Sequence, residues 1–242
     1  MSSNPRRPVV KREFKVGDHV TWNSEAGHVH RLAQGLGVAK GERLRGTVYP
    51  TLEALLAAVR ACRVCEAHLP LGPRPVLRAG ATARILVVGQ APGVRVHTTG
   101  IPWDDPSGER LRAWMGVDGG VFYDESRIAI IPMGYCYPGR GNGGDMPPRR
   151  ECATLWLDQL LARLPRIELT LLIGQYAQRH FLGSRRKSSL AATVRAWPEY
   201  APHYVPLPHP SPRNQPWFKH HSWFERQLVP MLRARVNALA AR

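Results

Sequence analysis

The strongest constraint on the fold is a set of four short apolar runs without polar alternation. The first run, residues 83–88, ends in Ile85-Leu86-Val87-Val88 and breaks at once into Gly89-Gln90-Ala91-Pro92-Gly93. The others lie at residues 127–132, 168–173 and 204–207. Such runs are typical of strands covered on both faces, as in a parallel sheet flanked by helices. Gly89 and Gly93 would let the backbone of the first loop approach a ligand closely.

Helical patterns separate these runs. Leu52, Leu55, Leu56 and Val59 recur at helical spacing behind Thr51, a suitable N-cap. Further helices are expected at residues 107–115, 151–164 and 175–181 and from residue 223 to the C-terminus, whereas residues 139–148 are rich in Gly and Pro and are expected to form a loop. The alternation predicts an α/β fold: a three-layer α/β/α sandwich with a central, mostly parallel four-stranded sheet. Loops at the strand ends should carry the function.

The chain length favours one main domain. We expect residues 51–242 to form it and residues 1–50 to be a partly flexible N-terminal extension, with a possible short β element at residues 14–22. One hypothesis makes this extension a docking module for a partner protein.

The net charge of +16 favours a polyanionic partner. Arg185-Arg186-Lys187 forms a basic loop and is a candidate for phosphate contacts. A general excess of arginine would produce some of this charge without any nucleic acid. The sequence contains no apolar stretch long enough to span a bilayer and no apolar signal sequence, so we expect a cytoplasmic protein without a membrane partner.

The four cysteines are spaced as Cys62-x-x-Cys65, Cys136 and Cys152. One close pair and two further thiols beside predicted loops can converge on a single tetrahedral thiolate site. Thiolate ligands select zinc or an iron–sulfur cluster over hard cations. Chemistry alone does not separate these two.

Several motifs occur in a telling order: Cys-x-x-Cys, Gly89-Gln90-Ala91-Pro92-Gly93, Gly-Ile-Pro-Trp ending at Trp103, two cysteines, and His-Pro-Ser-Pro-Arg-Asn at residues 209–214. Together they resemble the uracil-DNA glycosylase superfamily over roughly residues 52–236. The cysteine spacing is similar to that of its iron–sulfur families four and five, which implies a [4Fe-4S] cluster. The motif at residues 209–214 resembles that of the single-strand-selective monofunctional branch.

The resemblance implies roles for individual residues. Such enzymes flip a nucleotide out of DNA and break its N-glycosidic bond through an oxocarbenium-like state. Trp103 occupies the position of the family's base-stacking residue, and His209 would donate to a base oxygen as charge accumulates there. In the second loop, Pro210, Ser211 and Pro212 would press on the DNA, Arg213 would fill the gap left by the flipped nucleotide, and Asn214 would support the loop.

Two departures from the family pattern concern catalysis and base recognition. Gln90 and Ala91 stand where relatives carry the water-activating acid, and a neutral Gln orients water but cannot take its proton. Asp104 and Asp105 are the nearest replacements; we favour Asp105, with Ser107 as the cap of the following helix. Pro132 stands where an Asn reads uracil, so Asn142 or Gln90 would read the base, beside Gly89 and Ala91.

The sequence thus predicts a monofunctional DNA glycosylase, acting as a monomer on DNA and associated with the nucleoid when bound. One alternative is a protein of the same superfamily that binds lesions or modified DNA without cleaving it. Another is a glycosylase directed at modified, foreign or phage bases, for which the glycine-rich residues 139–144 would leave room.

Overall fold

A central sheet of four parallel strands organises the part of the chain, residues 47–241, that a computed structural model describes. The strands are β1 (Ile85–Val88), β2 (Ile128–Ile130), β5 (Leu169–Ile173) and β6 (Tyr204–Leu207), and their spatial order is β2-β1-β5-β6. Every neighbouring pair is parallel. The predicted α/β/α sandwich with a four-stranded central sheet is therefore confirmed.

Both faces of the sheet are buried, which explains the unalternating apolar runs. Leu86 and Val88 join one hydrophobic cluster, whereas Ile85 and Val87 join a second cluster on the opposite face. The four side chains are at most 1% exposed. Each residue of β1 is thus committed to a dry interior, and a polar side chain at any of these positions would lose its hydration without compensation.

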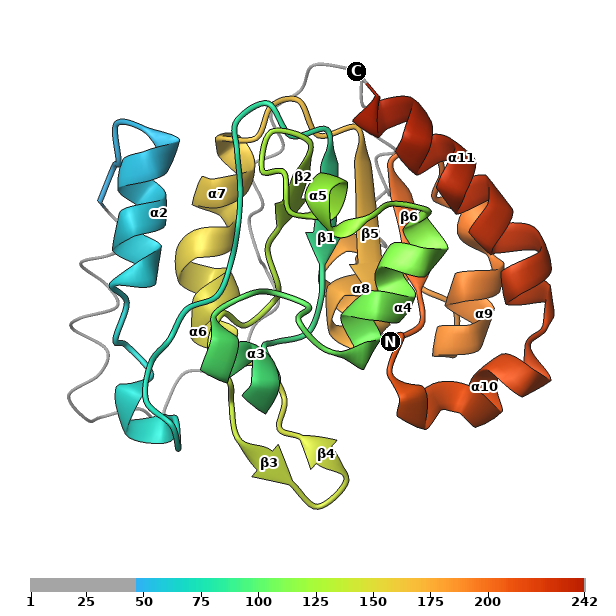
Figure 1. Ribbon diagram of the computed structural model, residues 1–242. Coiled ribbons are helices and arrows are strands. Elements are labelled where there is room, and N and C mark those ends of the chain that lie inside the picture. Colours follow the sequence, from blue (N-terminus) through green and yellow to red (C-terminus); the bar gives the residue numbers. More distant parts are fainter. Residues whose placement is uncertain (1–46, 242) are drawn as a thin grey trace, which may run out of the picture. The chain divides into compact units, whose positions relative to one another are not determined.

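Helices cover each face of the sheet (Figure 1). The first cluster is completed by α2 (Leu52–Arg60), by a continuous helical stretch of α6 (Arg150–Cys152), a π-helical segment (Ala153–Leu157) and α7 (Asp158–Ala162), and by α8 (Gly174–Leu182). The second is completed by α4 (Pro106–Met115), α5 (Gly119–Phe122), α9 (Leu190–Arg195), α10 (Gln215–His220), a second π-helical segment (Phe224–Leu228) and α11 (Val229–Ala240).

Local sequence signals place several helix ends. Thr51 caps α2, because its hydroxyl accepts the Ala54 N–H at 3.2 Å. The expected cap of α4 was wrong: Asp105, not Ser107, is the N-cap, and its Oδ1 accepts the Gly108 N–H at 2.8 Å. Pro106 occupies the first turn, where its missing N–H costs nothing, and Ser107 is buried inside the helix.

Short elements escaped the sequence patterns. Residues 139–148, expected to be a loop, contain an antiparallel hairpin of β3 (Arg140–Gly141) and β4 (Gly144–Asp145). Helix α3 (Val94–Thr99) follows the first glycine loop directly, and α5, α9 and α10 were also unexpected. Elements of two to six residues carry too little hydrophobic periodicity to be recognised from sequence. Single helical turns complete the chain, at Glu66–His68, Gly183–Arg185, Trp197–Glu199 and Pro212–Asn214.

The carboxyl edge of the sheet is held by main-chain bonds that continue beyond the strands. Met133 N–H donates to the Gly89 carbonyl at 3.0 Å, and Gly134 N–H donates to the Gln90 carbonyl at 2.9 Å. On the outer side of β2, Arg78 pairs with Ile130 through two main-chain bonds, which covers the sheet edge. The first glycine loop is thereby fixed to the rigid sheet.

The expected extension lies outside the described residues except for residues 47–50, and so does the β element expected at residues 14–22. No helix within residues 47–241 has the length and apolar character needed to cross a membrane.

Gln178 of α8 offers a test of how the carboxyl edge is held. Its side chain is 1% exposed, and its Nε2 donates to the Leu207 carbonyl at 2.9 Å and to the Leu172 carbonyl at 3.3 Å. Gln178→Ala should lower the free energy of unfolding by about 2–4 kcal/mol, because it leaves a cavity and removes both of these hydrogen bonds. Urea denaturation measures the change.

The control is Gln227→Ala, an exposed position on the second π-helical segment, which should stay within about 0.5 kcal/mol of the wild type. Equal stabilities of the two variants would contradict the assigned role of Gln178.

Candidate active site

A cavity of about 470 Å³ opens at the carboxyl ends of β1, β2 and β6. Ligands of open α/β sheets bind at this edge, where loops from several strands converge. The cavity is lined mainly by residues from the first glycine loop, the Trp103 turn, the β3–β4 hairpin and the His209 loop. The lining includes Val76, Gly89, Gln90, Ala91, Gly93, Arg95, Trp103, Asp105, Ile130, Pro132, Tyr137, Arg140, Asp145, His209, Ser211 and Arg213.

A second cavity, of about 570 Å³, lies at the amino edge of the sheet. Two of its three arginines already have partners: Arg84 pairs with Glu168, and Arg127 pairs with Asp124 at 3.0 Å. This second cavity is therefore a groove between paired surface charges. The side chains suited to catalysis lie around the first cavity, at the carboxyl edge of the sheet.

Trp103 is held in a strained position at the mouth of the first cavity. Its φ of +58° is the left-handed region, which bulky residues rarely adopt. Two glycines make room for it: a Cβ on Gly89 would lie 2.8 Å from the Trp103 ring, and a Cβ on Gly108 would lie 1.8 Å from the Trp103 carbonyl oxygen. Glycine at these two positions therefore leaves the space that Trp103 needs, and the indole is held over the first loop.

His209 faces Trp103 across the cavity. The two ring centroids are 5.7 Å apart and the planes are inclined by 35°. Ser211 N–H donates to His209 Nδ1 at 3.2 Å, so the neutral ring carries its proton on Nε2. Desolvation lowers the pKa of His209, and the Asp105 charge opposes part of that shift. The imidazole is therefore neutral at pH 7 and has one N–H to donate.

The loop that carries His209 is braced by its own residues. Asn214 Nδ2 donates to the His209 carbonyl at 2.8 Å, and the Ser211 hydroxyl accepts the Arg213 N–H at 3.3 Å. Pro212 and Arg213 stay exposed on the outer side of the turn. This arrangement presents an exposed cation directly beside the cavity.

Carboxylates reach the cavity from two directions. Asp105 lines it from the start of α4, and Asp145 lines it from the hairpin. Burial raises the pKa of Asp145, the charges of Arg213 and Arg140 lower it, and the charge of Asp105 raises it. Asp104 is not among the lining residues and approaches Arg95 at 4.0 Å.

These loops fall within a known family. A model of the Uracil DNA glycosylase superfamily matches residues 78–233. The chain belongs to this superfamily. The matched segment contains the sheet, the Trp103 turn and the His209 loop. Membership of the superfamily suggests a DNA glycosylase-type function.

The structure brings together most of the residues that the sequence assigned to the glycosylase site. Gly89, Gln90, Ala91, Trp103, Asp105, His209, Ser211 and Arg213 all line the cavity. Asn142 does not: it is exposed in the hairpin turn between β3 and β4. A base-reading role for Asn142 therefore has no support from its position in the free protein.

The basic loop 185–187 lies elsewhere. The Arg185 guanidinium lies 5.6 Å from the Tyr204 ring centroid, at the amino end of β6, whereas His209 follows the carboxyl end of that strand. Lys187 pairs with Glu199. These residues and Arg186 are thus placed away from the cavity, and a contact of theirs with DNA stays a prediction.

The four cysteines come from three segments of the chain. Cys62 and Cys65 follow α2, Cys136 follows β2, and Cys152 ends α6. Burial, together with smaller contributions from the charges of neighbouring thiols, raises the pKa of Cys136 to about 11 and that of Cys152 to about 12. Among the described residues, however, no group of three or more His, Cys, Asp or Glu side chains is arranged to hold a metal ion.

Sequence reasoning missed the hairpin's contribution to the site. Arg140 and Asp145 line the cavity, yet residues 139–148 were expected to form a loop because they are rich in Gly and Pro. Glycines 141, 143 and 144 were the available signal, since a glycine turn between two short segments permits a hairpin. Tyr137 was missed too, because no motif singles it out.

A substitution at Gly108 tests how tightly the structure packs around Trp103. Gly108→Ala should lower the free energy of unfolding by about 1–3 kcal/mol, because the new methyl forces the Trp103 carbonyl to move. It should also shift the indole N–H resonance of Trp103 in the nuclear magnetic resonance spectrum.

Gly119→Ala is the matched control, since a Cβ at Gly119 meets nothing within 4 Å. A Gly108→Ala protein as stable as the Gly119→Ala protein, with an unmoved Trp103 resonance, would contradict the packing described.

Proposed function

We propose that this chain is a monofunctional DNA glycosylase that flips a deaminated or otherwise modified base into the cavity, hydrolyses its N-glycosidic bond and leaves an abasic site. The observation that carries the proposal is the facing pair of Trp103 and His209, with centroids 5.7 Å apart, in a superfamily-matched cavity at the carboxyl edge of the sheet. The protein would act as a cytoplasmic monomer on DNA.

His209 would stabilise the negative charge that the departing base acquires. Breaking the bond leaves negative charge on a base oxygen, and a preorganised N–H stabilises that charge more in the transition state than in the ground state. The Ser211 N–H on Nδ1 keeps the proton of the neutral ring on Nε2. His209 is therefore set up to donate without first being protonated.

Trp103 gives the flipped base a stacking surface. An indole ring offers a large π-face at low entropic cost, and its strained backbone is fixed by packing against Gly89 and Gly108. Stacking does not discriminate strongly between bases. Recognition therefore falls to Gln90, whose amide bears both a donor and an acceptor, and to the main chain of Gly89 and Ala91.

Cationic side chains around the cavity suit the phosphates of a bent DNA strand. Arg95, Arg140 and Arg213 line it, and the whole chain carries a net charge of +16. Ser211 and the exposed Pro212 would press on the DNA beside Arg213, whereas Pro210, expected from the sequence to do the same, is buried in the free protein. Asp105 and Asp145 are the carboxylates in this cavity that could activate water.

A base-excision panel on defined oligonucleotides tests the function. We expect single-turnover release of base from at least one of uracil, hypoxanthine, xanthine or hydroxymethyl-pyrimidine DNA. His209→Gln should slow it by about 10²–10³-fold, because the donor to the leaving base is displaced. DNA binding, measured in the same samples by fluorescence anisotropy, should change little.

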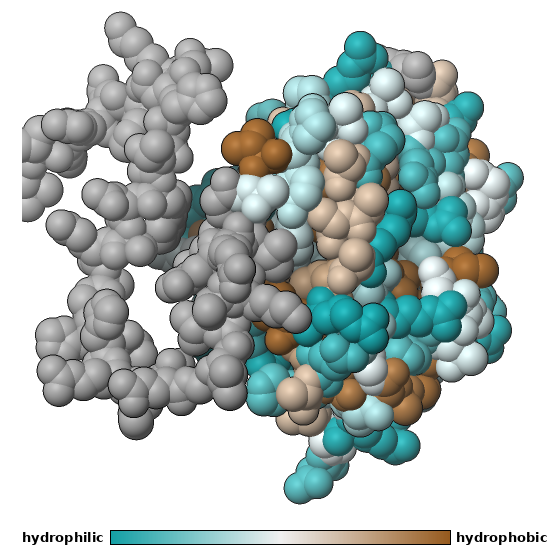
Figure 2. Space-filling model, turned by 90° about the vertical axis from the view of Figure 1, so that its left-hand side faces the viewer, coloured by the Kyte–Doolittle hydropathy of each residue, from teal (hydrophilic) through white to brown (hydrophobic). Residues whose placement is uncertain are grey.

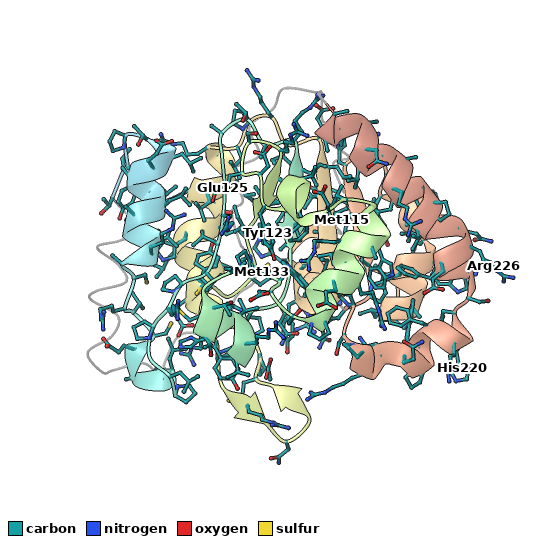
Figure 3. The ribbon with its side chains drawn as sticks, viewed as in Figure 1. Met115, Tyr123, Glu125, Met133, His220 and Arg226 are labelled. Atoms are coloured by element: carbon teal, nitrogen blue, oxygen red, sulfur yellow. The ribbon has the colours of Figure 1, made fainter. Side chains whose placement is uncertain are left out.

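The matched control is His220→Gln. His220 is exposed at the end of α10 and points outward, away from the sheet (Figure 3). Its rate should equal that of the wild type. Binding without release of any base by the wild type would favour a non-cleaving recognition protein instead, and an unaffected His209→Gln rate would remove His209 from the site.

One observation favours bases larger than uracil as the substrate. Val76, Ile130 and Pro132 line the cavity. The resemblance to the superfamily's uracil-reading families places Pro132 where they carry an Asn, and proline has no side-chain donor or acceptor. An apolar wall accepts an added substituent more readily than it reads a pyrimidine edge. Modified or foreign bases in the panel should therefore be released, and activity confined to uracil would overturn this preference.

We further propose that the four cysteines hold a [4Fe-4S] cluster rather than zinc. Four thiolates suit either group, and the spacing of the four cysteines along the chain is similar to that of the superfamily's iron–sulfur families. The thiols lie close enough for their charges to raise one another's pKa. The Tyr135 N–H, 3.4 Å from Cys152 Sγ, resembles the hydrogen bonds that tune cluster sulfurs. Bound there, a cluster would cross-link the segment after α2 to Cys136 and α6.

Metal analysis of protein purified without oxygen tests the cluster. We expect about four iron and four sulfide per chain with a broad visible absorption band. Cys152→Ser should lose the band and lower the melting temperature. Stoichiometric zinc without sulfide would contradict the proposal.

A further inference from the structure

The first glycine loop lacks an acid, yet a carboxylate lies against it in space. Asp145 Oδ2 lies 3.5 Å from the position that a Cβ on Gly93 would occupy. This carboxylate comes from β4, more than fifty residues further along the chain. The hairpin projects below the sheet (Figure 1) and forms a largely hydrophilic protrusion at the lower end of Figure 2.

We propose that Asp145 is the catalytic carboxylate that activates the hydrolytic water, in place of the acid missing from Gly89-Gln90-Ala91-Pro92-Gly93. This inference rests on the proposed glycosylase function and adds to it a catalytic residue outside the two motif loops. The hairpin thereby becomes part of the active site.

The hairpin is hydrogen-bonded to the first glycine loop and lies beside the His209 loop. Met146 N–H donates to the Gly139 carbonyl at 2.8 Å, and the Gln90 amide reaches the Met146 carbonyl at 3.4 Å. On the other side, a Cβ on Gly144 would lie 3.4 Å from an Arg213 guanidinium nitrogen. The carboxylate is therefore positioned between the Gln90 loop and the His209 loop.

Asp105 is the rival base, and its bonding argues for a different role. Its Oδ1 accepts the Gly108 N–H at 2.8 Å and so caps the N-terminus of α4. This oxygen is therefore already used in holding the start of the helix. Asp105 is better suited to holding the Trp103 turn and placing negative charge near His209.

Asp145, unlike Asp105, does not cap a helix. Its side chain accepts no hydrogen bond among those found in the described residues, and partial burial raises its pKa, which suits a general base. The charges of Arg140 and Arg213 lower the pKa of Asp145. In a complex with DNA, these two side chains would instead contact phosphates. DNA would then cover a carboxylate that is exposed in the free hairpin.

The reaction balances with water as the sole co-reactant. As the bond between C1′ and the base nitrogen breaks, its electron pair leaves with the base, and the His209 Nε2–H stabilises the resulting anion. A water oxygen bonds to C1′ while Asp145 accepts the water's proton. That proton then passes through solvent to the departed base, giving an abasic sugar and a neutral base.

The test compares Asp145→Asn with the wild type on the best substrate of the excision panel. Asn keeps the shape and removes the charge, so single-turnover release should fall by at least about 100-fold. DNA affinity should stay equal or increase, because a negative charge near the phosphates has gone. Glu225→Gln, an exposed change on the second π-helical segment, is the control and should match the wild-type rate.

A second variant separates chemistry from structure. Asp145→Ala should be slow but partly rescued by added formate, which can enter the cavity as a free carboxylate. A parallel loss of DNA binding, or the absence of rescue, would overturn the catalytic assignment.

The failure of this inference is distinguishable from that of the glycosylase itself. A wild type that releases base while Asp145→Asn matches its rate would overturn the role of Asp145 and leave the glycosylase intact. A wild type that releases no base from any oligonucleotide would overturn both.

Discussion

Burial of both faces of a four-stranded parallel sheet is the constraint on which the rest of the structure depends. Because alternate residues of β1 enter two different cores, the strand has no solvent-facing side and its position is fixed from both directions. Parallel strands then end at a common edge. The Gln90 loop and the His209 loop, about 120 residues apart, are brought together there by this geometry.

The same edge concentrates the features that cost stability. Trp103 holds a positive φ, and Gly89 and Gly108, where a Cβ would clash with Trp103, lose more backbone entropy on folding than other residues would. Strain of this kind costs about 1–3 kcal/mol and persists only where the surroundings enforce it. Here the surroundings are main-chain bonds and a capped helix start, both anchored on the sheet.

Electrostatics at this edge combine a neutral donor with acids and cations. Desolvation keeps His209 neutral at pH 7, and the Ser211 N–H selects its tautomer. Two carboxylates enter from opposite sides, one held by a helix N-terminus and one carried on a hairpin between cations. Because their surroundings differ, the carboxylates of Asp105 and Asp145 can have different roles in the same site.

The sequence pattern was enough to predict the α/β layering, the four strands, the superfamily and eight of the residues that line the cavity. Short-range patterns suffice there, because uninterrupted apolar runs require a doubly covered sheet and the two motif loops follow its strands directly. The cap at Asp105, the hairpin, the exposure of Asn142 and the placement of the basic loop 185–187 away from the cavity emerge only in three dimensions. These depend on contacts between distant segments, and the approach of Asp145 to Gly93 is the clearest case: the two lie far apart along the chain and close together in space.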